Sequence, residues 1–141
     1  MTVPKTPLLT TDCAIFDPRG YVLLIRRKHP PFAGDYALPG GFVELGETVE
    51  AACAREVREE TGVEVGTLQL IGVYSTPGRD PRGHTVSIAF ATRLPIEVDA
   101  RAGSDAASAE WIEDWRKVVL AFDHAKILED AARSVMPPYR C

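Results

Sequence analysis

The chain has 141 residues, of which 45% are hydrophobic, and this size and composition predict one compact domain spanning residues 1–141. A formal net charge of −4 leaves no basic stripe, so we expect neither a nucleic-acid partner nor an anionic membrane partner. No secretory or membrane-spanning segment is visible and the three widely spaced cysteines lack a metal or disulfide pattern, which predicts a soluble cytoplasmic protein.

Two apolar segments open the chain, Leu8 to Phe16 and Tyr21 to Lys28, and both contain the residue types of strands. The tetrapeptide Asp17-Pro18-Arg19-Gly20 between them has Pro at the second and Gly at the fourth position of a type I turn. The pattern predicts a β-hairpin. An irregular connection is expected next, in the Pro- and Gly-rich stretch from His29 to Gly41.

The clearest helix of the sequence lies between Thr48 and Gly62. Thr48 is a favourable N-cap residue, Glu50 adds negative charge to the first turn, and helix-forming residues continue to Thr61. Gly62 suits the left-handed position that follows the last turn of many helices.

Two strands are predicted after this helix, from Val65 to Thr76 and from Thr85 to Leu94. The second strand alternates large apolar residues with small or polar ones. The small and polar residues from Asp99 to Ser108 predict a loop, which precedes a short apolar segment at Trp111 and Ile112.

The last predicted helix has Asp123 as its N-cap and ends at Pro137-Pro138. Apolar positions recur along it at the spacing of one helix face. We interpret His124 on this helix, and also His29, as structural residues, because neither has a partner that the sequence reveals.

One acidic motif carries the chemistry of the sequence, at residues 41–63, GFVELGETVEAACAREVREETGV. At about 100° per residue, Glu56, Glu59 and Glu60 fall within an arc of roughly 100° that shares the apolar stripe of the helix. Arg55 and Arg58 fall on the far side. Carboxylates gathered against a partly desolvated surface repel one another unless a cation neutralises them, which disfavours the alternative of a solvated acidic face. Such hard oxygen ligands suit Mg²⁺, with Mn²⁺ as the alternative ion.

The motif resembles the signature of the Nudix hydrolase family, whose specified positions are occupied here by Gly41, Glu47, Arg55, Glu56, Glu59, Glu60 and Gly62. The resemblance implies an α/β fold, the Nudix α/β/α sandwich with a mixed β-sheet, and metal-dependent hydrolysis of a phosphoanhydride bond. The metal ligands that it implies are Glu56, Glu59, Glu60 and the backbone carbonyl of Gly40. The family signature at residues 41–63 is called the Nudix box, and Arg55 would orient one of its glutamates. The catalytic set that the resemblance implies is Glu59, Arg55 and Glu56, with Glu47 in support.

The general base stays open at this point, since family members use either a box glutamate or an acidic residue of an outside loop. The candidates are Glu59, Glu110 and Asp105, and the last two are equally explained as surface residues. Structural requirements explain other box positions. Glycine at 40 and 41 allows a tight loop, Gly62 ends the helix, and the valines at 57 and 63 pack.

Residues 75–90, STPGRDPRGHTVSIAF, resemble the segment after the box in bacterial and archaeal ADP-ribose pyrophosphatases, and residues 121–128 resemble the start of their last helix. This resemblance implies a small-molecule nucleotide substrate, ADP-ribose, split into AMP and ribose 5-phosphate. It leaves the oligomeric state open, with a homodimer among the alternatives. Other hypotheses are a MutT-like nucleoside triphosphate pyrophosphatase and a non-catalytic ADP-ribose sensor. The complete set of box carboxylates and the few residues after the last helix favour an enzyme over a DNA-binding sensor.

Basic residues supply the candidate substrate contacts, because guanidinium and imidazole groups suit phosphate and ribose oxygens. They are Arg79, Arg82, His84, Arg26 and Arg27. The last two are neighbours on a strand and therefore face opposite sides. For residues 80–83 a plain turn is the alternative, since they repeat the tetrapeptide of residues 17–20. The aromatic residues available as a wall for a base are Phe32, Tyr36 and Tyr74.

Overall fold

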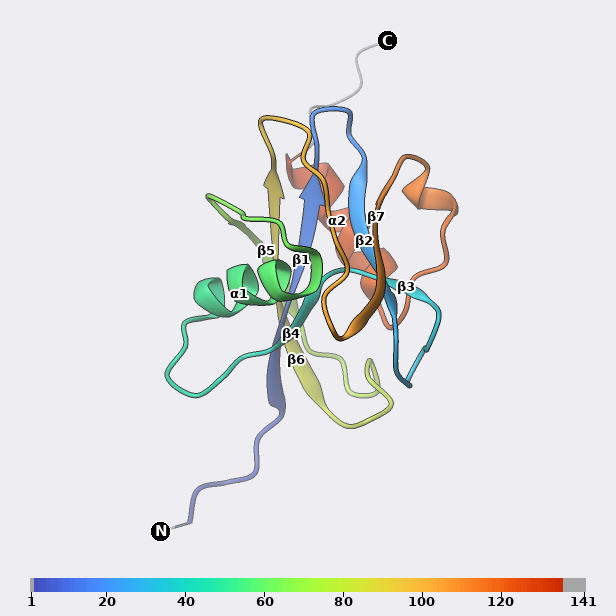
Figure 1. Cartoon of the computed structure of the whole chain (residues 1–141). Helices are drawn as coiled ribbons and strands as arrows, with labels where there is room; N and C mark the ends of the chain where they lie inside the picture. Colours follow the sequence, from blue (N-terminus) through green and yellow to red (C-terminus); the bar gives the residue numbers. More distant parts are fainter. Residues whose placement is uncertain (1, 136–141) are drawn as a thin grey trace.

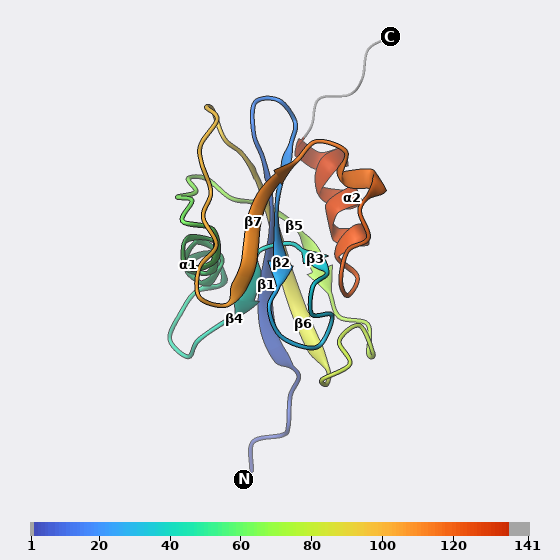
Figure 2. The ribbon, with the colours of Figure 1, turned by 45° about the vertical axis from the view of Figure 1, so that its right-hand side comes forward.

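A mixed sheet of seven strands runs through the molecule, with one α-helix packed on each face (Figures 1 and 2). The computed structural model describes residues 2–135. The strands are β1 (Leu8–Phe16), β2 (Val22–Arg27), β3 (Tyr36–Ala37), β4 (Gly40–Phe42), β5 (Gln69–Tyr74), β6 (Thr85–Arg93) and β7 (Ala106–Ile112). The helices are α1 (Val49–Thr61), α2 (His124–Val135) and a 3-10 turn at Trp115–Lys117. The predicted α/β/α sandwich with a mixed sheet is confirmed.

Strand β1 lies at the centre of the sheet, whose order is β3-β2-β1-β6-β5, with β4 also paired to β1 and β7 to β2. β6 runs parallel to β1 along its full length, whereas the other pairs are antiparallel. The opposite edge of β1 is shared. β4 pairs with Thr10–Asp12 and β2 pairs at Phe16. The sheet therefore opens between β2 and β4, beside Asp12.

Each face of the sheet has its own apolar cluster. On the α1 face, Val57 belongs to a buried cluster with Ile15 of β1. On the α2 face, Leu128 shares a cluster with Ala89 and Ala91, the small side chains of β6. Because successive residues of a strand point to opposite faces, one central strand serves both helices. Each fully buried large aliphatic side chain contributes roughly 1.5–3 kcal/mol to stability.

The predicted ends of α1 are confirmed. The side chain of Thr48 accepts a hydrogen bond from the backbone N–H of Ala51 at 3.1 Å, as an N-cap residue does. Gly62 has a φ of 73°, and its N–H donates to the carbonyl of Arg58 at 2.9 Å. These local signals fix the helix that carries the acidic motif.

Several predicted boundaries were wrong. β5 begins at Gln69, so the strand predicted from Val65 lacks its first residues. The loop predicted up to Ser108 ends earlier, because β7 begins at Ala106 and pairs along β2. Its alanines and serine have weak strand propensity, and this pairing decides their conformation. The Pro- and Gly-rich connection also contains the short strands β3 and β4.

Helix α2 begins at the predicted residue, but Asp123 does not cap it with its side chain. The two Asp123 carboxylate oxygens instead accept hydrogen bonds from Arg79 at 2.9 and 2.7 Å. The predicted end at Pro137-Pro138 lies outside the described residues. Within residues 2–135, neither helix combines the length and the apolar character that a bilayer span requires.

Candidate active site

The glutamates of α1 meet the paired glycines of β4. Glu60 is 7% exposed, and its Oε1 accepts a hydrogen bond from the backbone N–H of Gly40 at 3.1 Å. A Cβ added to Gly41 would lie 2.6 Å from the Glu56 carboxylate, closer than any side chain can approach. A side chain at position 41 would therefore displace the Glu56 carboxylate, which occupies that space in the structure. The tight loop expected at residues 40 and 41 was wrong, because both glycines lie in strand β4 and pair with β1.

Arg55 holds the acidic cluster together. Its Nε and Nη2 donate to the two carboxylate oxygens of Glu47 at 2.6 and 2.9 Å. Its Nη1 lies 2.9 Å from Glu56 and 3.2 Å from Glu59. The expectation that Arg55 lies on the far side of the helix was wrong, because its long side chain reaches around the helix to the carboxylates. Bidentate contact identifies Glu47 as its main partner.

The three box glutamates differ in exposure. Glu56 and Glu60 lie on the inward stripe as expected, with side-chain exposure of 18% for Glu56. Glu59 does not, since 55% of its side chain is exposed. It joins the cluster through Arg55 and remains open to solvent.

Burial dominates the electrostatics of the cluster. It raises the pKa of Glu60 to about 9, aided by the nearby carboxylate of Glu56 and opposed by the N–H of Gly40. Burial also raises the pKa of Glu56, although Arg55 acts against it. By contrast, the hydrogen bonds from Arg55 lower the pKa of Glu47 to about 2. The inner pair of carboxylates thus lacks a full counter-charge.

This donor set fits a hard divalent ion. Among residues 2–135, no group of three or more His, Cys, Asp or Glu side chains is placed to hold a metal ion by itself. Magnesium does not need one, because one or two carboxylates usually hold it while water and substrate phosphate complete its octahedron. Glu56 and Glu60 beside the backbone of Gly40 offer such a partial shell, and Gly41 leaves room for it.

A small polar pocket of about 70 Å³ adjoins Glu60, in the opening beside β1. Asp12 and His124 lie in its wall. The N–H of Leu38 donates to Nδ1 of His124 at 3.0 Å, so the ring proton lies on Nε2, 3.3 Å from Asp12 Oδ1. These two contacts agree with the structural interpretation of His124, which stays a prediction, and its position in the pocket wall was not foreseen. The only sequence signal for Asp12 is that it is the one charged residue of its strand, Leu8–Phe16.

Arg27, Arg79 and Arg82 also line this pocket. Arg79 is 5% exposed at its side chain and donates to Asp123 and to Thr85 Oγ1, the latter at 2.8 Å. It therefore ties the loop after β5 to the start of α2. Its predicted contact with substrate stays a prediction.

The turn alternative for residues 80–83 is confirmed. The N–H of Gly83 donates to the carbonyl of Asp80 at 3.3 Å, and the Asp80 carboxylate accepts from the N–H and guanidinium of Arg82. Residues 17–20 make the same contacts. The second copy differs in its surroundings, because Arg82 lies 5.6 Å from the ring centre of Phe122 in the pocket wall.

Arg26 and Arg27 point to opposite sides of β2, as expected. Arg27 faces the pocket and lies 4.9 Å from the ring centre of Phe122, whereas Arg26 donates to the hydroxyl of Tyr36 at 2.8 Å. His84 lies on the exposed loop before β6, with its Nε2 2.9 Å from the carbonyl of Ser75. The structure thus brings Arg27, but neither Arg26 nor His84, into the pocket.

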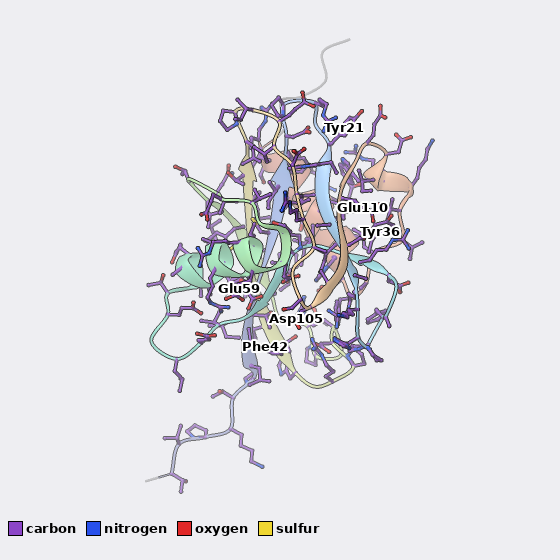
Figure 3. All side chains as sticks on the ribbon, viewed as in Figure 1. Tyr21, Tyr36, Phe42, Glu59, Asp105 and Glu110 are labelled. Carbon is purple, nitrogen blue, oxygen red and sulfur yellow. The ribbon has the colours of Figure 1, made fainter. Side chains whose placement is uncertain are left out.

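The two outside candidates for a general base lie in different places. Glu110 is in β7, on a strand and not on a loop as supposed, and it accepts from Tyr36 at 3.2 Å (Figure 3). It points to the α2 face with its cross-strand neighbour Leu24. Asp105 follows Gly103, whose N–H donates to the carbonyl of Glu60 at 2.9 Å. The Asp105 loop therefore packs against the end of α1 that carries the cluster.

Comparison with known proteins agrees with this geometry. The family model described as NUDIX domain matches residues 6–134. An ADP-ribose pyrophosphatase from Methanocaldococcus jannaschii is 49% identical over 90% of this chain and 74% of its own length. The ADPR responsive transcriptional repressor NtrR of Acinetobacter baylyi is 35% identical over 89% of this chain, which spans only 53% of that longer protein.

A solved structure extends the likeness to three dimensions. The NUDIX domain of Shewanella oneidensis NrtR, crystallised with ADP ribose, superposes with a TM-score of 0.87 at 27% identity, covering 94% of this chain and 90% of that one. The family match covers most of the chain, and the acidic helix, the paired glycines and the sandwich occur together within it. The chain belongs to the Nudix family.

Proposed function

We propose that this protein is a hydrolase that uses a divalent metal ion, preferably Mg²⁺, to split the pyrophosphate bond of ADP-ribose into AMP and ribose 5-phosphate. The observation that carries the proposal is the buried pair Glu56 and Glu60, packed against the glycines of β4 with too little positive charge of their own. A site of this kind supports binding of a cation together with an anionic substrate.

Glu56, Glu60 and the backbone of Gly40 would hold the ion. When bound there, a divalent ion neutralises pyrophosphate charge and activates water. The chain supplies the positioning. Arg55 fixes Glu56 through its Nη1 while Glu47 holds the other side of the guanidinium. The hydrogen bond from Gly40 fixes Glu60.

We propose Glu59 as the residue that accepts the proton from the attacking water. Its carboxylate is the solvent-facing member of the cluster and Arg55 orients it at 3.2 Å. Glu110 is engaged with Tyr36 and Ser108, and these hydrogen bonds lower its pKa, which weakens it as a base. Asp105 remains the second candidate because its loop packs on α1.

The choice of ADP-ribose is supported by the archaeal relative, whose name records that activity, and by the NrtR domain crystallised with the same compound. Arg27 and Arg82 offer guanidinium groups to the substrate at the pocket. Incubation with ADP-ribose, ADP and nucleoside triphosphates in the presence of Mg²⁺ tests the choice. AMP released from ADP-ribose is expected. Pyrophosphate released from a triphosphate, with ADP-ribose untouched, would assign a MutT-like activity instead.

Binding of ADP-ribose without turnover would assign the sensor function that the similarity to NtrR suggests.

The variants Glu59→Gln and Glu60→Gln test the metal site itself, and Glu64→Gln, at an exposed position just after α1, is the matched control. Loss of AMP formation in the first two but not in the control is expected. Unchanged activity in all three would refute the metal site.

We further propose a cytoplasmic enzyme without a nucleic-acid partner. The free, buried thiols of Cys13 and Cys53 support a reducing compartment, and the net charge of −4 disfavours a polyanion. A homodimer stays a prediction that sedimentation of the purified protein tests.

A further inference from the structure

An open groove of about 620 Å³ lies next to the small polar pocket, and the proposed reaction does not by itself assign it a role. Its walls are the segment just before and at the start of β1, Phe42 of β4 and the turn at residues 80–85. Asp80 and Arg82 line both cavities. The groove and the pocket are therefore neighbours that share a wall.

The two cavities follow one face of β1. Leu8 lines the groove, whereas Thr10 and Asp12 line the pocket. Alternation along a strand places these three side chains on the same face. Phe42 is the direct cross-strand partner of Thr10, so its ring lies on this face too. A ligand that extends from the pocket along β1 enters the groove.

Size separates the roles of the two cavities. Small-molecule sites usually have volumes of about 300–1,000 Å³, a range that includes the groove and excludes the pocket of about 70 Å³. Phe42 is 41% exposed and Leu8 is 61% exposed, so the groove offers apolar surface to a ligand. Lys5, Arg82 and His84 add positive charge or hydrogen-bond donors at its rim.

The groove reaches the acidic cluster through the small pocket, because Glu60 lines that pocket and Asp80 and Arg82 line both cavities. Phe42 follows Gly41, which packs against Glu56, and the carbonyl of Phe42 accepts a hydrogen bond from Arg55 at 3.1 Å. On the other side, Arg82 lies 5.5 Å from the Phe42 ring centre. A pyrophosphate held beside Glu60 in the pocket thus places the adjoining nucleoside within reach of an exposed aromatic ring and a guanidinium group.

We propose that this groove binds the nucleoside half of the substrate, with the base stacked on Phe42 and the 5′-phosphate of the nucleoside directed toward Arg82 and Glu60 in the pocket. The proposal rests on the proposed function for the identity of the nucleoside as adenosine. Stacking of a base on an aromatic ring is sequence-tolerant, so Leu8 and the rim residues would select the ligand by shape.

Two phenylalanines of equal exposure provide the test. Phe42 is 41% and Phe32 is 40% exposed, but Phe32 packs on Phe122 and lines neither the groove nor the pocket. Calorimetric titration of the full chain with AMP and with ribose 5-phosphate requires no turnover. Phe42→Ala is expected to weaken AMP binding by roughly tenfold or more and to leave ribose 5-phosphate binding unchanged. Phe32→Ala should change neither, and Phe42→Trp should restore AMP binding.

A second pair of variants, at Leu8 and Leu70, tests the groove independently in case the Phe42 variant does not fold. Leu8 and Leu70 are 61% and 60% exposed, and both lie on strands, but only Leu8 lines the groove. Leu8→Ala should weaken AMP binding and Leu70→Ala should not.

The outcomes separate the two proposals. Weaker AMP binding in Phe42→Ala and Leu8→Ala supports the groove, even if ADP-ribose is not hydrolysed. Selective loss of ribose 5-phosphate binding, an equal effect of Phe32→Ala, or absence of AMP binding by the wild-type protein would overturn it. If ADP-ribose is hydrolysed but both groove variants bind AMP as tightly as the wild type, the proposed reaction is supported and the proposed role of the groove is refuted.

Discussion

Replacing Glu60 by Gln is expected to stabilise the metal-free protein at pH 7 while it abolishes activity. Glu60 has a pKa of about 9 in the folded protein and an ordinary value of 4.5 when unfolded. Its contribution to stability is therefore fully present below pH 4.5 and is lost as the pH rises toward 9. At pH 7, holding the proton costs up to about 3 kcal/mol, and Gln removes that cost. Gln can still accept from Gly40 and donate toward Glu56, so the variant should gain about 1–3 kcal/mol.

The measurement is urea denaturation in EDTA at pH 5, 7 and 9, with Glu64→Gln as the exposed control. The stability difference between the Glu60 variant and the wild type should widen from pH 5 to pH 9, and the control should show no such trend. Added Mg²⁺ should reverse the order, because ligation stabilises only the wild type. A variant less stable than the wild type at pH 7 in EDTA, or a gap that does not change with pH, would refute the electrostatic reasoning.

Other predictions follow from the same contacts. Gly41→Ala places a Cβ 2.6 Å from the Glu56 carboxylate and should lower kcat by about 10²-fold in a Mg²⁺-saturated assay, whereas wild-type kcat would contradict the steric argument. Glu59→Gln should lower kcat by about 10²–10⁴-fold and Glu110→Gln by less than about twofold. If steady-state kinetics show the larger loss of kcat in Glu110→Gln, Glu110 and not Glu59 is the general base. Ile127→Ala removes a fully buried side chain of α2, far from the carboxylates, and should cost about 2–5 kcal/mol in urea denaturation with kcat retained. A large fall in its kcat would indicate coupling between α2 and the cluster.

Local signals explain which parts of the fold could be predicted. The ends of α1 depend on Thr48 and Gly62, whose effects reach only a few residues, and both ends were predicted correctly. β7 depends on β2 for its hydrogen bonds, so its Ala- and Ser-rich start was taken for a loop. Short strands such as β4 likewise exist because a partner strand lies beside them.

The features of the site that could not be predicted depend on side-chain reach and on contacts between residues far apart in the sequence. Helical angles placed Glu56 and Glu60 together, but they ignore side-chain length and so misplaced Arg55. Arg79 was a candidate substrate contact in the sequence, yet its side chain is buried against Asp123, a residue 44 positions away. No spacing rule links Asp12 to His124, because only the folding of α2 onto β1 brings them together.

The shared edge of β1 also determines where this protein can change its choice of substrate. Widening the opening beside Asp12 would require breaking backbone pairs with β2 or β4, and such a change would affect the whole sheet. The segment 77–84 supplies Arg79, Asp80 and Arg82 to the pocket at this opening, and the segment 28–35 packs on the pocket wall through the contact of Phe32 with Phe122. Both segments lie outside all strands and helices. Selection for a new ligand can therefore act on these two segments, while the hydrolytic cluster and the sheet stay as they are.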